Sequence, residues 1–236
     1  MRKTLIIAAL VAASASAAGA ATVDTSAGTQ GLVFQFSGLS DLGVSSYNAG
    51  VVPSIGIGGE FDIDDAGLFG IGFKHYLSDM LAIRPSLELG IASVKEDART
   101  GGETDEKVSL TSIGLSAILE KHMPSPAAPV SPFLGVGAGF GVGSVKYEPH
   151  RNNNPTQGEL LETKVSGTSF AAFGLAGFEV AVMDGVNLGG EYRLGFKSTS
   201  ASEEVERQGV ETDKNDVSAF SLGFSTASLF ATIAWK

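Results

Sequence analysis

The fold is decided by residues 70–85, which read GIGFKHYLSDMLAIRP. On either side of Asp79, apolar residues alternate with small or polar ones, and the side chains of a β-strand point alternately to two faces. The stretch therefore predicts two strands joined by a tight turn. Residues 177–193 repeat the arrangement around Asp184-Gly185, a dipeptide that favours hairpin turns.

Working outward from these hairpins, the same alternation predicts eight strands. They cover about 31–39, 67–77, 80–93, 108–121, 132–146, 165–182, 186–199 and 217–235. Most are longer than the five or six residues usual in soluble sheets, and a tilted strand needs about 9–11 residues to cross a bilayer. We assign residues 53–59 to the first long connection, with an additional strand there as the alternative.

Short and long connections alternate strictly along the chain. The short ones centre on Asp79, on residues 123–129 and on Asp184-Gly185, whereas the long ones cover about 40–66, 94–107, 147–164 and 200–216. The long connections carry net charges of −5, −2, −1 and −4. Because residues 21–236 have a net charge of −12, the rest of that segment is neutral in total. Short turns at one end and long loops at the other are typical of outer-membrane barrels.

The first twenty residues predict a cleaved signal peptide, with a membrane anchor as the alternative. Arg2 and Lys3 precede a short apolar run, and the small residues 15–20 follow it. An exported chain agrees with the absence of Cys. After residue 20 no apolar run is long enough for a transmembrane helix, and a pI of about 4.7 argues against nucleic acid as a partner.

The second face of the predicted strands is unusual, because it consists of glycine with a few charges. We expect it to line the inside of a narrow barrel. Unpaired charges in such an interior are costly, so we predict an ion-pair network, with hydrated positions near the rim as the alternative. Its members are Lys74, Arg84, Glu88, Glu120, Glu179, Glu191, Arg193 and Lys197. The strands 108–121, 165–182 and 217–235 alternate less regularly, which predicts a β-bulge in some of them.

Aromatic residues near strand ends give a further indication. Tyr76 and Trp235 fall at the short-turn end and Tyr147 at the long-loop end. Outer-membrane barrels carry aromatic girdles at both membrane interfaces. We therefore expect these three side chains at the interfaces.

The hairpins of residues 70–85 and 177–193 resemble those of small outer-membrane β-barrel proteins of the OmpA/OmpX type. The resemblance covers nearly all of residues 21–236, which we treat as one domain. It implies an all-β, eight-stranded, antiparallel, up-and-down transmembrane barrel in the outer membrane of a Gram-negative bacterium. Trp235 keeps the alternating pattern of the last strand, but Lys236 follows where the family commonly ends in an aromatic residue.

Catalytic, cofactor and metal sites are not predicted. The three histidines His75, His122 and His150 show no converging ligand pattern and no His-x-Ser pair. No G-x-S-x-G elbow, G-x-G-x-x-G or P-loop motif occurs. The acidic clusters 62–65 and 203–206 match no EF-hand loop, and we interpret them as solvated, with a weak divalent-cation role near lipopolysaccharide phosphates as the alternative.

The expected role is non-enzymatic: an envelope-structural or surface-interaction protein with a lumen filled by side chains. Expected partners are outer-membrane lipid and lipopolysaccharide, the barrel-insertion machinery and an extracellular partner of the acidic loops, with the protein as a monomer. The alternatives are a small channel for ions or apolar solutes, a lipid-modifying enzyme and a soluble secreted β-protein.

Overall fold

A computed structural model describes residues 22–37, 68–96, 105–123, 129–149, 159–210, 213–224 and 228–236. The predicted signal peptide 1–20, the connection 40–66 and the alternative strand 53–59 lie outside these residues. Within the described part of the chain, no helix is long and apolar enough to cross a membrane.

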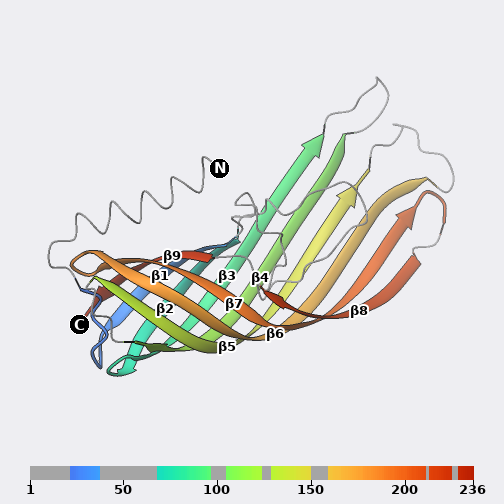
Figure 1. Cartoon of the computed structure of the whole chain (residues 1–236). Helices are drawn as coiled ribbons and strands as arrows, with labels where there is room; N and C mark the ends of the chain where they lie inside the picture. Colours follow the sequence, from blue (N-terminus) through green and yellow to red (C-terminus); the bar gives the residue numbers. More distant parts are fainter. Residues whose placement is uncertain are drawn as a thin grey trace, which may run out of the picture.

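The described residues form one antiparallel sheet that closes into a ring (Figure 1). From β1 to β8 each strand pairs with the next along the chain, and β9 pairs with both β7 and β1. The predicted all-β antiparallel barrel is therefore confirmed. The strands are β1 (Gln30–Ser37), β2 (Leu68–Ser78), β3 (Leu81–Glu96), β4 (Glu106–His122), β5 (Val130–Glu148), β6 (Leu160–Met183), β7 (Val186–Arg207), β8 (Asp213–Phe224) and β9 (Ser228–Trp235).

Nine strands are described where eight were predicted, because β8 and β9 share the place of the last predicted strand. Both pair with β7 in the same antiparallel direction. Leu194 faces Phe224, whereas Glu191 faces Ser228. Three steps along β7 thus separate positions whose partners are four residues apart in the sequence, so the register shifts by one residue between β8 and β9.

The hairpins extend further than the sequence predicted. β7 continues to Arg207 and β8 begins at Asp213, so most of the predicted loop 200–216 is strand. The predicted loop 147–164 likewise shortens, because β6 begins at Leu160. The prediction assigned these polar residues to loops. A hairpin can keep its backbone pairing with polar side chains where both of its faces are exposed to water.

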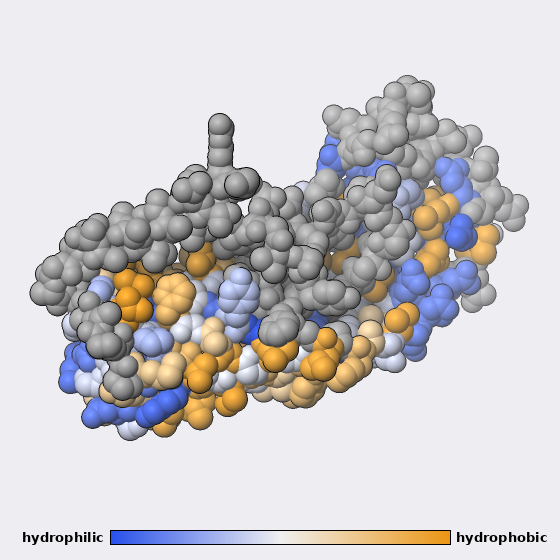
Figure 2. Space-filling view, in the orientation of Figure 1, coloured by the Kyte–Doolittle hydropathy of each residue, from blue (hydrophilic) through white to orange (hydrophobic). Residues whose placement is uncertain are grey.

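The exterior of the barrel is apolar at mid-height. Large apolar side chains such as Leu115, Phe140, Phe170 and Leu194 point outward and are about half exposed. Figure 2 shows hydrophobic surface along the middle of the molecule and hydrophilic surface at both ends. An outward apolar band between polar ends is the surface expected of a barrel embedded in a bilayer.

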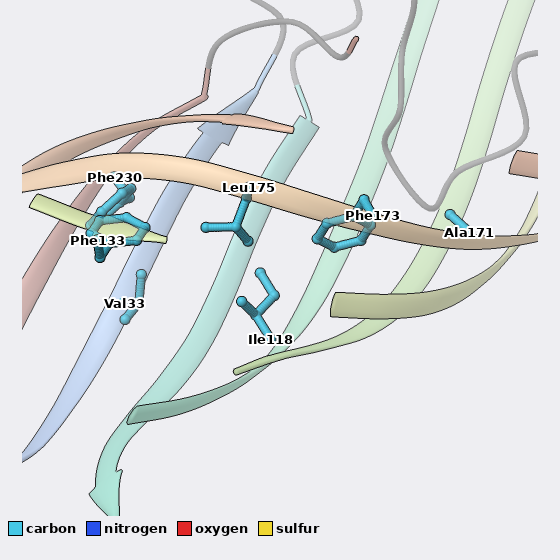
Figure 3. Packing of buried hydrophobic residues seen from close by; sticks show 7 residues of the cluster. All are labelled: Val33, Ile118, Phe133, Ala171, Phe173, Leu175 and Phe230. Carbon is cyan, nitrogen blue, oxygen red and sulfur yellow. The ribbon is translucent and has the colours of Figure 1, made fainter. Parts of the chain in front are cut away.

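Aromatic and aliphatic side chains fill part of the interior (Figure 3). The Phe133 ring lies where a side chain on Gly177 would stand, and a Cβ on Gly137 would come within 2.7 Å of the Phe173 ring. Glycines on neighbouring strands thus leave room for inward aromatic rings, which explains their abundance on this face. The buried apolar cluster consists of Val33, Ile118, Phe133, Ala171, Phe173, Leu175 and Phe230.

Candidate functional site: the charged interior of the barrel

Eight charged side chains face the interior of the barrel beside the apolar cluster. They come from β2, β3, β4, β6 and β7, and each is at most 5% exposed. They are the eight residues that the alternation placed on the inner face: Lys74, Arg84, Glu88, Glu120, Glu179, Glu191, Arg193 and Lys197. Four positive and four negative charges balance, which keeps the buried set neutral in total.

Lys74 on β2 joins two carboxylates, one from β4 and one from β6. Its Nζ atom lies 2.7 Å from Oε2 of Glu120 and 2.6 Å from Oε1 of Glu179. The same ammonium lies over the Phe133 ring, 5.3 Å from the ring centre. The position is thus fixed both by charge and by a cation–π contact.

Arg84 carries the network to the other side of the lumen. Its Nε atom lies 2.8 Å from Oε1 of Glu120, and its Nη2 donates a hydrogen bond to Oε2 of Glu191. Glu191 also receives Arg193, whose Nη2 lies 2.7 Å from Oε1. Glu120 and Glu191 therefore each contact two cations. This arrangement offsets the cost of burying their charge.

Arg193 and Lys197 extend the network toward the long-loop end of β7. Arg193 reaches Glu88 at 3.5 Å and lies over the Phe173 ring, 4.8 Å from its centre. Lys197 is 5% exposed and lies on the same inner face of β7 as Arg193. The structure thus joins seven of the eight predicted residues into one chain of contacts across the lumen, and it places Lys197 on the same inner face.

A hydrogen-bonded group that the sequence analysis missed lies next to this network. Nδ1 of His122 is 2.8 Å from Oγ of Ser131, and Nε2 of His122 is 3.1 Å from the Tyr76 hydroxyl. His122 and Ser131 are nine residues apart on β4 and β5, across the short connection near Pro129. The available signal was that His122 and Ser131 both have inward parity on adjacent strands, whereas a His-x-Ser pair lies along a single strand.

Two of the three predicted interface aromatics lie elsewhere. Tyr76 is only 4% exposed and points into the lumen, so its assignment to a membrane interface was wrong. Tyr147 shares the inner parity of β5 and interacts with Glu106. Proximity to a strand end was a weaker guide than alternation. Trp235 does point outward, is 46% exposed and lies 6.3 Å from the Phe73 ring.

Glu120, His122 and Glu179 form the one group in the described residues whose atoms could surround a metal ion. Their candidate ligand atoms lie within 4.8 Å of one another. The Lys74 ammonium, however, already contacts both carboxylates. A cation is thus built into the chain at this point, and the donor set does not call for a metal.

Comparison with known proteins decides the family. The family model described as "Outer membrane protein beta-barrel domain" matches residues 5–226. The chain belongs to this family. The barrel is therefore located in the bacterial outer membrane, with its apolar exterior toward lipid.

A solved structure adds support for the fold. The crystal structure of a major outer membrane protein from Thermus thermophilus has a TM-score of 0.52 to this barrel. The match covers 88% of this chain and 99% of that one, at 11% sequence identity. At this identity the likeness concerns the fold alone. No curated protein matches the barrel in sequence.

Proposed function

We propose that this outer-membrane barrel is a non-enzymatic envelope protein whose lumen is closed by side chains. The observation that carries the proposal is the buried network joined by Arg84, which contacts Glu120 and Glu191 while lying over the Phe230 ring. An eight-stranded interior is just wide enough for side chains to fill. Charges, rings and hydrogen-bonded groups together occupy it here, which favours a structural role over a pore.

The conductance of the purified protein in planar bilayers tests the closed lumen. The wild type is expected to give no stable unit conductance. The double variant Arg84→Ser/Glu191→Ser keeps the interior neutral but removes two large side chains, and it is expected to conduct. The matched control is Lys146→Ser/Glu148→Ser, which removes an ion pair of 2.6 Å from the exposed part of β5 and should remain closed. Stable conductance of the wild type would favour the channel alternative.

The envelope role is tested in cells that lack the protein. Such cells are expected to lose resistance to detergent, and the wild-type gene should restore it. The Ser131→Ala variant should restore it equally, because Ser131 and His122 face the interior and are only 7% and 1% exposed. Failure of Ser131→Ala to restore resistance, with normal amounts of folded protein, would instead support hydrolytic chemistry at this pair.

A further inference from the structure

A shallow, open groove crosses the outer face of β4 to β8 above the apolar exterior, outside the lumen site. It has a volume of about 730 Å³. Two cross-strand rows form its sides, and one small-residue row forms its floor. The floor residues are Ser112, Gly143, Gly167 and Ala201, which are direct partners across the sheet.

The side of the groove farther from the apolar exterior is rich in hydroxyl groups. Thr111, Ser144, Ser166, Ser202 and Asp216 are successive cross-strand partners on β4, β5, β6, β7 and β8. The hydroxyls of Ser144 and Ser166 are 3.3 Å apart. This row offers neutral donors and acceptors, with one carboxylate at its β8 end, and so suits a hydroxyl-bearing ligand.

The side nearer the apolar exterior consists of Ile113, Val142, Thr168 and Ser200, and the next row away from the groove consists of Leu115, Phe140, Phe170, Ser198 and Phe220. The four apolar residues of that row are 48–71% exposed. The outward residues change from apolar to hydroxyl-bearing between Ile113 and Thr111 on β4 and between Val142 and Ser144 on β5, and one position earlier on β6, between Phe170 and Thr168. Such a boundary is where the acyl chains of a membrane lipid end and its head group begins.

Directly beyond the hydroxyl row lies a row with three lysines and one glutamate. Lys146, Lys164, Glu204 and Lys214 are cross-strand partners on β5 to β8. The side chains of Lys146 and Lys214 are 43% and 65% exposed, and both pair with glutamates. Exposed ion pairs contribute little to stability, so these ammonium groups can exchange a carboxylate for a phosphate.

We propose that this groove binds a phosphorylated, acylated glucosamine lipid, the chemistry of lipid A, in the outer leaflet. The inference rests on the proposed function, because it needs the barrel to be embedded with its long hairpins outward. The three tiers match the ligand in order: apolar side chains meet acyl chains, the hydroxyl row meets the sugar, and the lysine row meets phosphate. The head group lies across five strands, and so connects the outer half of the barrel to the lipid leaflet.

Native mass spectrometry of the detergent-released protein tests the proposal with three probes. These are bis-phosphorylated lipid A, its monophosphorylated form and phosphatidylglycerol. The wild type is expected to retain one bis-phosphorylated lipid A at least about tenfold better than either of the others, given the usual effect of each lysine near an anionic surface. Equal retention of all three would overturn the proposal, because it would show a general lipid annulus.

Two variants probe the tiers separately. Lys164→Ala/Lys214→Ala should weaken lipid A retention by about thirtyfold. Ser166→Leu, which fills the groove and keeps every charge, should also weaken it. The control is Lys121→Ala, an exposed outward lysine at the short-turn end of β4, and it should bind like the wild type. A loss with Lys121→Ala equal to that of the double variant would overturn the site.

A competition experiment and a folding control complete the test. Inorganic phosphate should not displace the bound lipid, and displacement would overturn the proposal by showing that phosphate alone is recognised. Altered migration of unboiled protein on electrophoresis verifies that each variant is folded, and if the double variant fails this check, Ser166→Leu decides. If the wild-type barrel is folded and non-conducting but shows no preference among the three lipids, this inference is refuted and the proposed envelope function is unaffected.

Discussion

Replacement of Arg84 by methionine is expected to destabilise the barrel strongly. The side chain is 1% exposed and contacts the carboxylates of Glu120 and Glu191. After the change Glu120 retains Lys74 and Glu191 retains Arg193, but the interior carries one uncompensated negative charge. Removing one partner of a buried ion pair costs about 3–5 kcal/mol, and we expect Arg84→Met to lower the free energy of unfolding by this amount.

Urea unfolding in phospholipid vesicles measures this loss. The fluorescence of Trp235, the only tryptophan, reports the transition from the outer face of β9. The comparison variant is Lys214→Met, which removes an ion pair of 2.6 Å from an exposed position and should unfold like the wild type. The reasoning fails if Arg84→Met unfolds at the wild-type urea concentration, or if Lys214→Met costs as much.

A second change distinguishes lost charge balance from lost packing. Arg84→Met/Glu191→Gln leaves three positive and three negative charges in the interior. If the cost of Arg84→Met is electrostatic, the double variant should be at least about 1 kcal/mol more stable than the sum of the single effects predicts. Additive losses would show that the two side chains matter through packing alone.

Two further predictions concern other parts of the molecule. Gly177→Ala should destabilise the barrel by about 1–3 kcal/mol in the same unfolding assay, because the new Cβ would overlap the Phe133 ring and lie 2.6 Å from a backbone oxygen. Gly174→Ala has no neighbour closer than 3.9 Å and should be as stable as the wild type, so equal losses would contradict the packing argument. The hydrogen bonds from Ser26 hold the pKa of Asp24 below its usual 3.8, and NMR titration should show this value rise in Ser26→Ala. Because the folded pKa is the lower one, Asp24 stabilises the fold above about pH 3.8, and this contribution is lost as the pH falls through the lowered value; an unchanged pKa in Ser26→Ala would refute the assignment.

Strict alternation is what made the barrel predictable from the sequence. In β3, Arg84 and Glu88 share a parity with small residues, and the same parity placed Glu191 and Arg193 inward on β7. The abundance of glycine on the inner face also has a structural reason, because inward rings such as that of Phe133 occupy the space that a side chain would need. These features are local, and one strand is enough to reveal them.

Features that depend on two strands were harder to predict. The His122–Ser131 contact requires the register between β4 and β5, which the sequence pattern does not contain. The extension of β7 to Arg207 was missed because Ala201 and Val205 are the only apolar residues in 200–207 and give too weak an alternation. The groove beside Ser166 forms only when five strands are aligned, since each strand alone contributes one polar residue to the row.

The central claim is a closed barrel in the outer membrane, with the first strand joined to the last. Phe34 and Ala231 are direct partners on β1 and β9, and the protein contains no cysteine of its own. We predict that Phe34→Cys/Ala231→Cys forms a disulfide on mild oxidation of isolated outer membranes, since opposed pairs in antiparallel strands bring their Cβ atoms close enough. Phe34→Cys/Thr232→Cys, whose second position points to the opposite face, should not. A missing bond in the first pair, or equal bonding in both, would contradict the closed barrel.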